Sequence, residues 1–253
     1  MRVTVAQLPS LADKAEILGR ISEVVETTET DLVVFPEGVM HDFRPRVDLT
    51  AVAEPLDGPF AARLQEVATR SGRAIVAGVW ESAGEQRVHN TVVIIDRRGT
   101  LIGAYRKIHL FDSFGFSESE RVVPGPIDPC VIDLEGVRLG IMTCYDLRFP
   151  ELARALSAQG SQAFVVPAGW VAGEHKVDHW RTLLRARAIE NTVFVAASAL
   201  SEPWYTGHST VIDPMGLVVA ELDVEPGLAT AEISAERVIE VRTMLPSLTH
   251  RRM

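Results

Sequence analysis

The chain has 253 residues and a formal net charge of -9, because 34 Asp and Glu outnumber 25 Lys and Arg. Its 47% hydrophobic and 23% charged residues are typical of a globular protein and exclude intrinsic disorder, collagen-like repeats and coiled coils. An acidic surface repels phosphate backbones and anionic lipids, so we expect neither a nucleic acid nor a membrane surface as a partner.

The cysteine content and the first residues of the chain indicate a compartment. Only two cysteines are present, Cys130 and Cys144, which does not suit a disulfide framework and is typical of a reducing cytoplasm. The first residues lack the apolar core of a signal peptide, and no uninterrupted apolar run approaches the roughly 18 residues of a membrane span. These features predict a cytoplasmic protein with no membrane-spanning segment.

Strand and helix patterns alternate from the start of the chain. A short strand at 3–5 precedes a helix for which Ser10 is the expected N-cap, with Asp13 three residues on as a variant of the capping box. A buried strand at 31–35 is followed by a second helix, which begins at Pro59 because proline suits the first turn of a helix.

The rest of the chain continues this alternation. Two helices are expected at 150–159 and 176–190, and the long irregular stretch at 108–126 is typical of a functional or mobile loop. The hairpins exclude a purely parallel sheet and a simple eightfold barrel, and the pattern favours α/β layers in one domain over residues 1–253. Hydrophobic runs predict further strands at 74–80, 92–96, 101–105, 130–134, 137–143, 163–166, 193–197, 209–212, 217–220 and 228–233.

Three reactive side chains, Glu37, Lys107 and Cys144, come directly after three of these predicted strands. Taken singly, a free cysteine is usually a small buried hydrophobe, and a glutamate or lysine is usually solvated. Open α/β sheets, however, usually bind their ligands at the carboxyl-terminal edge. A thiol, a carboxylate and an amine at three strand ends therefore form a candidate site.

The chemistry of the three groups fits nucleophilic catalysis. A free thiol with a pKa of about 8.5 is only a few per cent thiolate at neutral pH, so its attack needs a base. A carboxylate could accept that proton, and a nearby ammonium would stabilise the thiolate and then the oxyanion of a tetrahedral intermediate. No histidine has a clear claim as the base. The pattern therefore indicates a hydrolase or transferase with a cysteine nucleophile.

The segments around these residues resemble the signature blocks of the carbon–nitrogen hydrolase (nitrilase) superfamily. Two later segments, 179–191 and 207–216, resemble further blocks of the family, and the match runs from end to end in the family's order. The three signature blocks are Phe35-Pro36-Glu37, Tyr105-Arg106-Lys107-Ile108-His109-Leu110-Phe111-Asp112 and Cys144-Tyr145-Asp146-Leu147-Arg148-Phe149-Pro150-Glu151-Leu152.

The resemblance implies a four-layer α-β-β-α sandwich and a catalytic triad of Glu37, Lys107 and Cys144. Members of the family form an acyl-thioester on the cysteine, release ammonia or an amine, and hydrolyse the thioester with water activated by the glutamate, without a cofactor. Lys107 and the backbone N–H of Tyr145 would hold the oxyanion. Glu118 lies in the family's Phe-x-Glu-Ser setting and is a fourth candidate.

The motif wording is closest to that of omega-amidases and deaminated-glutathione amidases, which act on amides carrying a carboxylate. The segment between Lys107 and Glu118 is shorter than in the omega-amidases. This segment borders the site in the family, so the resemblance supports the reaction chemistry more strongly than it supports a particular substrate. We expect hydrolysis of a small aliphatic, carboxylate-bearing amide, with Trp170 lining the substrate pocket. The alternatives are an N-carbamoyl amide hydrolase, a nitrilase, a non-catalytic binding member of the fold and a metal-dependent amidohydrolase.

Other chemically suggestive residues have weaker claims. His175 and His179 have a metal-binding spacing but lack an H-E-x-x-H motif, so we predict no metal site. Gly207-His208-Ser209 begins like a nucleophile elbow, yet residue 211 is not glycine, which argues against a serine hydrolase. Cys130 is expected to be buried and inert. A solvated, salt-bridged helix face is expected for Arg181, Arg185 and Arg187.

The resemblance also implies self-association as a homodimer or a higher homo-oligomer. We expect the helices at 150–159 and 176–190 to face the partner, with a contribution from the tail at 246–253.

Overall fold

The computed structural model describes residues 1–84, 86–201 and 203–252. Within these residues the chain forms two six-stranded sheets. The first contains β1 (Arg2–Gln7), β2 (Leu32–Val34), β3 (Ala74–Ser82), β4 (Val88–Ile95), β5 (Leu101–Arg106) and β12 (Gly227–Glu232). The second contains β6 (Val131–Leu134), β7 (Val137–Ile141), β8 (Ala163–Ala168), β9 (Phe194–Ala199), β10 (Thr210–Ile212) and β11 (Val218–Glu221).

The two sheets have matching topologies. Their strand orders are β12-β1-β2-β3-β4-β5 and β11-β10-β9-β8-β7-β6. In each sheet three neighbouring strands run parallel, β1-β2-β3 in one and β7-β8-β9 in the other, and antiparallel strands complete the edges. The mixture of crossovers and hairpins predicted from the sequence is therefore confirmed.

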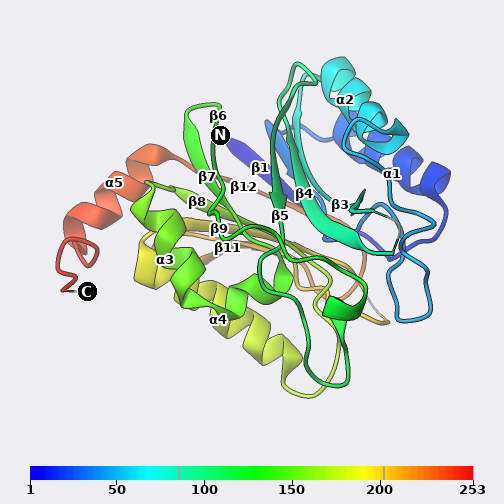
Figure 1. Ribbon diagram of the computed structural model, residues 1–253. Coiled ribbons are helices and arrows are strands. Elements are labelled where there is room, and N and C mark those ends of the chain that lie inside the picture. Colours follow the sequence, from blue (N-terminus) through cyan, green and yellow to red (C-terminus); the bar gives the residue numbers. More distant parts are fainter. Residues whose placement is uncertain (85, 202, 253) are drawn as a thin grey trace.

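Helices cover the outer faces of the two sheets, as Figure 1 shows. They are α1 (Lys14–Thr27), α2 (Pro59–Ser71), α3 (Pro150–Ala158), α4 (Lys176–Asn191) and α5 (Ala235–Met244). Helices α1 and α2 lie over the first sheet, and α3 and α4 lie over the second (Figure 1). The result is a four-layer α-β-β-α sandwich.

Side-chain alternation in the strands builds the layers. In β2, Leu32 and Val34 pack between the two sheets, whereas Val33 packs outward against the helices. Helix α1 meets that outward face with Ile17 and Ile21, which recur at helical spacing and are fully or almost fully buried. A strand that is buried on both faces consists of a continuous run of apolar residues, and β2 could be predicted from the sequence for this reason.

The structure corrects one prediction about a helix and adds one helix that the sequence analysis does not predict. Asp13, rather than Ser10, is the N-cap of α1, because its carboxylate accepts hydrogen bonds from the backbone N–H groups of Ala15 (2.8 Å) and Glu16 (3.1 Å). Ser10 lies before that turn and donates its hydroxyl to Asp42. Helix α5 is not predicted at all, because it buries only two apolar side chains, Val238 and Val241, and its apolar pattern is weak.

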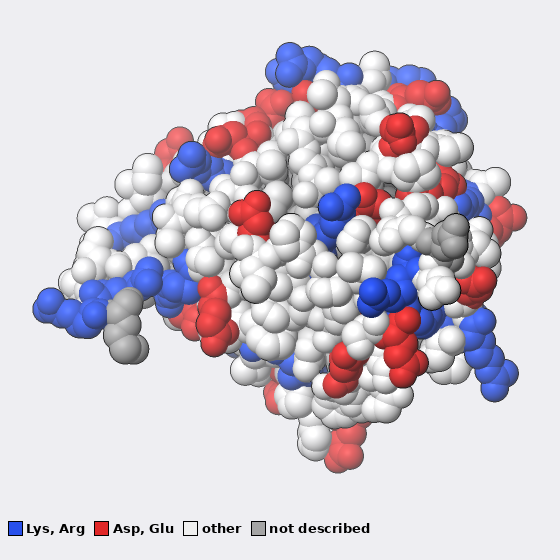
Figure 2. All heavy atoms as spheres, viewed as in Figure 1, with Lys and Arg blue, Asp and Glu red and all other residues white. Residues whose placement is uncertain are grey.

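The surface and the ends of the chain complete the description. Acidic and basic side chains are interspersed over the face shown in Figure 2, and basic residues gather beside the C-terminal end at the left of the view. Among the residues described, no helix combines the length and the apolar character needed to cross a membrane.

One close approach between backbones positions a candidate site residue. A Cβ atom added to Gly78, in β3, would lie 2.6 Å from the Cα of Glu37 and 2.5 Å from the amide nitrogen of Gly38. These are backbone atoms and cannot swing aside. The absence of a side chain at residue 78 therefore lets the chain carrying Glu37 lie directly against β3.

We predict that Gly78→Ala lowers the free energy of unfolding by about 1–3 kcal/mol, since overpacking forces the backbone to shift. The same shift displaces Glu37. Gly19→Ala is the matched control: Gly19 is exposed within α1, and a Cβ atom added there would meet no atom within 4 Å, so this change should stabilise the protein slightly. Urea unfolding of both variants tests the prediction, and equal stability of the two would contradict it.

Candidate active site

Three strand ends converge on one place between the sheets. Glu37 follows β2, Lys107 follows β5 and Cys144 follows β7, and the side chains of Glu37 and Lys107 are each 2% exposed. The burial of Cys144 is nearly as complete, at 8% exposure. The structure therefore brings together the three residues that the sequence singled out.

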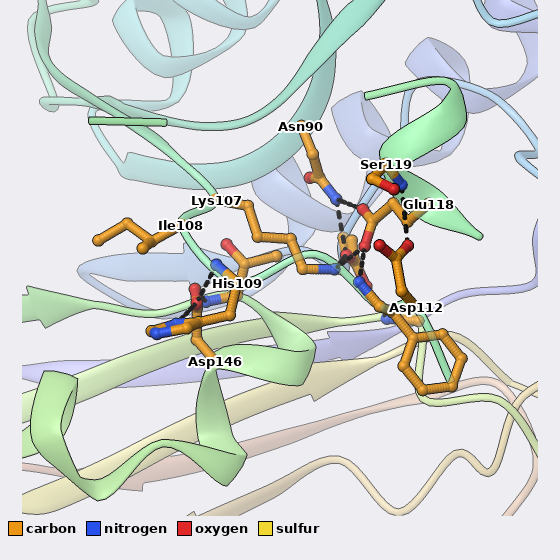
Figure 3. A network of polar contacts seen from close by, with 12 residues as sticks. Asn90, Lys107, Ile108, His109, Asp112, Glu118, Ser119 and Asp146 are labelled. Carbon is orange, nitrogen blue, oxygen red and sulfur yellow. Dashed lines mark hydrogen bonds and ion pairs between the residues drawn. The ribbon is translucent and has the colours of Figure 1, made fainter. Parts of the chain in front are cut away.

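A buried ion network surrounds the amine. The Lys107 Nζ donates to Oε1 of Glu37 at 2.9 Å and to Oε2 of Glu118 at 2.8 Å. The amide nitrogen of Asn90 donates to both carboxylates, at 2.7 Å and 3.0 Å respectively. Figure 3 shows the side chains of Lys107 and Asn90 both pointing toward the carboxylate of Glu118. Glu118, the fourth candidate, is thus part of the same network.

The second oxygen of Glu37 has its own partner. Its Oε2 accepts a hydrogen bond from the backbone N–H of Gly169, just after β8, at 2.7 Å. Both oxygens of the carboxylate are therefore held in place by donors from three different strands or strand ends. This leaves the group fixed in position yet ionised.

The pKa shifts follow from burial and from these contacts. Burial alone would raise the pKa of Glu37, but the Lys107 ammonium and three hydrogen-bond donors outweigh it and hold the pKa below its usual value. Burial would likewise lower the pKa of Lys107, but the charges of Glu118 and Glu37 raise it well above its usual value. At neutral pH Glu37 is therefore a carboxylate and Lys107 an ammonium.

The surroundings of Cys144 favour the neutral form of its side chain, whereas those of Glu37 and Lys107 favour the charged forms. Burial raises the pKa of Cys144 well above the usual value of a thiol, and the Glu37 carboxylate raises it further, although Lys107 acts in the other direction. The resting thiol is consequently neutral, with an ionised carboxylate beside it. This is the protonation state that a nucleophile and its general base need before reaction.

The backbone at Cys144 is strained in a way that presents its side chain. Its φ is +46°, in the left-handed region that non-glycine residues seldom adopt. Strand β7 ends three residues earlier, and the chain turns at Cys144 into a short 3₁₀ helix that leads to α3 at Pro150. Strain of this kind persists only where the surrounding structure enforces it.

Hydrogen bonds to Asp146 help to hold the backbone at Cys144 in this conformation. The Oδ2 of Asp146 accepts hydrogen bonds from the backbone N–H of Thr143 (2.9 Å) and from the hydroxyl of Tyr105 (2.7 Å). Its Oδ1 accepts one from the backbone N–H of His109 at 3.1 Å and lies 2.7 Å from that residue's Nδ1 (Figure 3). One fully buried carboxylate thus ties the cysteine turn to the segment that carries Lys107.

A small pocket opens beside the cysteine. It contains about 230 Å³ of empty space, part of which is open to solvent, and its wall includes Trp170 and Tyr145. Trp170 is 4% exposed, and its indole N–H donates to the backbone oxygen of Lys176 at 2.9 Å. The residues around the pocket include Phe111, Cys144, Tyr145, Arg148, Trp170 and Lys176.

The residues with weaker claims lie elsewhere. The exposed ring of His175 lies beside Glu174, whereas His179 contacts Arg148, so the two histidines do not face a common point. In the described part of the chain no cluster of three or more His, Cys, Asp or Glu could hold a metal ion. Ser209 is fully buried, and its hydroxyl donates to Gln7.

The expectations for Cys130 and for the arginines of α4 are met only in part. Cys130 is half-buried rather than buried, and burial raises its pKa to about 11. Arg181 pairs with Glu221 at the surface, as expected. Arg187, however, is 5% exposed, and its guanidinium donates to the backbone oxygen of Leu147 from two nitrogens. It therefore supports the turn that carries Cys144 instead of facing solvent.

Sequence reasoning missed several residues of the site. Asn90 is a polar residue inside the apolar strand β4, a signal that could have marked it. Gly169 contributes only its backbone N–H. Because every residue except proline has a backbone N–H, the residue type at this position gives no signal of the contact. Lys176 and Arg148 in the pocket wall were also not singled out, because neither residue follows a predicted strand.

Comparison with known proteins agrees with this arrangement. The family model described as carbon-nitrogen hydrolase matches residues 2–243. A protein named deaminated glutathione amidase, from Escherichia coli O157:H7, is 36% identical over an alignment that covers 94% of this chain and 91% of that protein.

Two solved structures share the fold. The Saccharomyces cerevisiae protein Nit3, described as a member of branch 10 of the nitrilase superfamily, has a TM-score of 0.89 at 29% identity and covers 100% of this chain and 97% of its own. An amidase variant from Nesterenkonia sp. AN1, whose active-site cysteine carries the product of Michael addition of acrylamide, has a TM-score of 0.81 at 27% identity over 98% and 99% of the two chains. The sandwich, the match over nearly the whole sequence and these relatives show that the chain belongs to the carbon–nitrogen hydrolase family and is an enzyme acting on C–N bonds.

Proposed function

We propose that this enzyme is an amidase that hydrolyses a small aliphatic amide through an acyl-thioester on Cys144, with Glu37 and Lys107 completing the catalytic triad. The observation that carries the proposal is the buried Glu37–Lys107 pair, with its 2.9 Å hydrogen bond, adjoining a neutral thiol on a strained turn. A fixed carboxylate base beside a protonated thiol is one arrangement that activates a thiol for acyl transfer.

In the first half-reaction Glu37 accepts the thiol proton while Sγ of Cys144 attacks the carbonyl carbon of the amide. The negative charge that develops on the carbonyl oxygen is stabilised by the Lys107 ammonium and by the backbone N–H of Tyr145. The tetrahedral intermediate then collapses, the C–N bond breaks, and Glu37 returns the proton to the departing nitrogen. The products are ammonia and a thioester on Cys144.

In the second half-reaction water replaces ammonia. Glu37 removes a proton from the water as its oxygen attacks the thioester carbon, and the same two donors hold the oxyanion. Collapse breaks the C–S bond, the proton returns to sulfur, and the carboxylic acid leaves. Glu118 keeps the charge of Lys107 balanced throughout, because Lys107 stays paired with it when Glu37 is protonated.

The substrate that we propose is an amide that also bears a carboxylate. Two observations support it: the pocket wall contains the cations Arg148 and Lys176, and relatives carry the name deaminated glutathione amidase. The pocket is small, which favours a short chain between the amide and the carboxylate.

We also propose that the enzyme acts in the cytoplasm as a homodimer or higher homo-oligomer in which α3 and α4 face the partner. Support comes from apolar side chains left exposed on α4 and nearby, among them Ile189 and Met215. The tail at 246–252 lies beyond α5, and Met253, the last residue of the predicted contact, lies outside the described residues.

Loss of the nucleophile gives the first test. Cys144→Ala should abolish ammonia release from short carboxylated amides, because no other group can form the thioester. Cys130→Ala, which removes a thiol that is not part of the network, should keep wild-type activity. Ammonia is measured over a panel of amides, nitriles and N-carbamoyl compounds. Activity that survives Cys144→Ala would refute the proposal. If the wild type acted only on the nitriles or only on the carbamoyl compounds, the enzyme would be a nitrilase or an N-carbamoyl amide hydrolase instead of an amidase.

Replacement of Glu37, the proposed base, gives a second test, in which turnover should fall and alkylation of Cys144 should become faster. Glu37→Gln should lower kcat about 10²–10⁴-fold, the usual contribution of general acid–base catalysis. The same change removes a negative charge that raises the pKa of Cys144, so the thiol becomes more acidic and iodoacetamide should alkylate it faster at pH 8.

The control for that test is Glu120→Gln, which removes an exposed carboxylate two residues from Glu118. It should change neither turnover nor alkylation. If Glu37→Gln slowed alkylation of Cys144 at pH 8, the carboxylate would be lowering the pKa of the thiol instead of raising it, contrary to the proposed resting state.

A further inference from the structure

Two cations occupy the pocket wall, and the triad chemistry uses neither of them. Lys176 is only 6% exposed, and among the residues described no carboxylate lies within ion-pair distance of its Nζ. Arg148 contacts His179 at 3.4 Å, and its buried Nε has no hydrogen-bond partner in the described chain. A buried cation is normally paired, so the unneutralised charge of Lys176, with the partly buried Arg148 beside it, requires an explanation.

Aromatic rings surround the ammonium of Lys176 but do not accept its hydrogen bonds. Its Nζ lies 4.0 Å from the ring centroid of Phe114, 5.0 Å from that of Phe111 and 5.9 Å from that of Trp170. Aromatic faces attract a cation, but they accept no conventional hydrogen bonds from the three N–H donors of an ammonium. Burial and the charge of Arg148 lower the pKa of Lys176, which shows that the surrounding protein disfavours its charge.

The backbone fixes where this ammonium stands. Lys176 is the first residue of α4, and the indole of Trp170 donates to its backbone oxygen across the intervening turn. His175, directly before it, has a φ of +59°, so the entry into the helix is a sharp, defined turn. The cation is thus placed in the wall of the cavity that Cys144 also lines, rather than on a mobile surface chain.

We propose that Lys176 is a specificity-determining residue that binds the carboxylate of the amide substrate, with Arg148 contributing positive charge beside it. This inference rests on the proposed amidase function and names the residue that selects its substrate. A carboxylate supplies the hydrogen-bond acceptors that Lys176 lacks and the negative charge that the two cations lack. Binding at Lys176 leaves the amide at the other end of a short substrate free to reach the neighbouring Cys144.

Binding of succinate, a carboxylate that undergoes no reaction, tests this without relying on turnover. Calorimetry should show that Lys176→Met weakens succinate binding by about ten- to a hundredfold, the usual effect of losing a charge-assisted hydrogen bond. Lys176→Arg, which keeps the charge, should recover part of the affinity. Arg181→Met is the matched control, because Arg181 lies on the same helix and pairs with Glu221 but does not line the pocket.

Kinetics with two amides of similar size provide the second readout. Succinamate carries a carboxylate where butanamide carries a methyl group, so the ratio of their kcat/KM values isolates recognition of the charge. Lys176→Met should lower this ratio about ten- to a hundredfold, mainly through a higher KM for succinamate, and Arg181→Met should leave it unchanged. Thermal unfolding of each variant excludes misfolding as the cause.

The outcomes separate this inference from the proposed function. Equal succinate affinity in wild type and Lys176→Met, or no succinate binding by the wild type, would overturn the role of Lys176 even if the enzyme hydrolyses amides. A wild type that binds succinate through Lys176 but releases no ammonia from any amide would instead refute the amidase proposal. An unchanged ratio of the two kcat/KM values would contradict the role of Lys176 in substrate selection.

Discussion

The site depends on one ammonium held between two carboxylates inside the protein. An isolated charge buried at the position of Lys107 would be strongly disfavoured, and so would a single carboxylate at the position of Glu37. Together with Glu118 and the amide of Asn90 they form a hydrogen-bonded network of net charge -1. In the proposed mechanism, transfer of the thiol proton to Glu37 moves charge within the site without changing its total, so Cys144 is activated without bringing a new charge out of water.

The fold makes that network possible by ending strands of both sheets at one place. Residues after β2 and β5 supply the carboxylate of Glu37 and the ammonium of Lys107, the turn after β7 supplies the thiol of Cys144, and the backbone after β8 donates a hydrogen bond to Glu37. Asp146 couples the cysteine turn to the segment from Tyr105 to His109, so Cys144 and Lys107 are positioned by shared contacts. Catalytic geometry of this kind needs rigid supports, and buried strand ends provide them.

The sequence was sufficient for the layers and for the main reactive residues, for physical reasons. Apolar runs with alternating helices determine which segments are buried, and Glu37, Lys107 and Cys144 each stand where such a run stops. Contacts that depend on the mutual placement of distant segments could not be predicted in this way: the N–H of Gly169 bonds Glu37 from 132 positions away. The position of Lys176 depends on the turn before α4, and Asp13 replaced Ser10 as the cap because the helix begins later than its flanking residues suggested.

Trapping of the covalent intermediate tests the central claim most directly. Wild-type enzyme turning over succinamate would be quenched rapidly and digested for mass spectrometry, with a parallel reaction containing hydroxylamine. The account predicts a succinyl group on the peptide that contains Cys144, and diversion of product from acid to hydroxamate when hydroxylamine is present. Release of ammonia with neither a Cys144 adduct nor any hydroxamate would mean that water attacks the amide directly, and it would contradict a thioester mechanism.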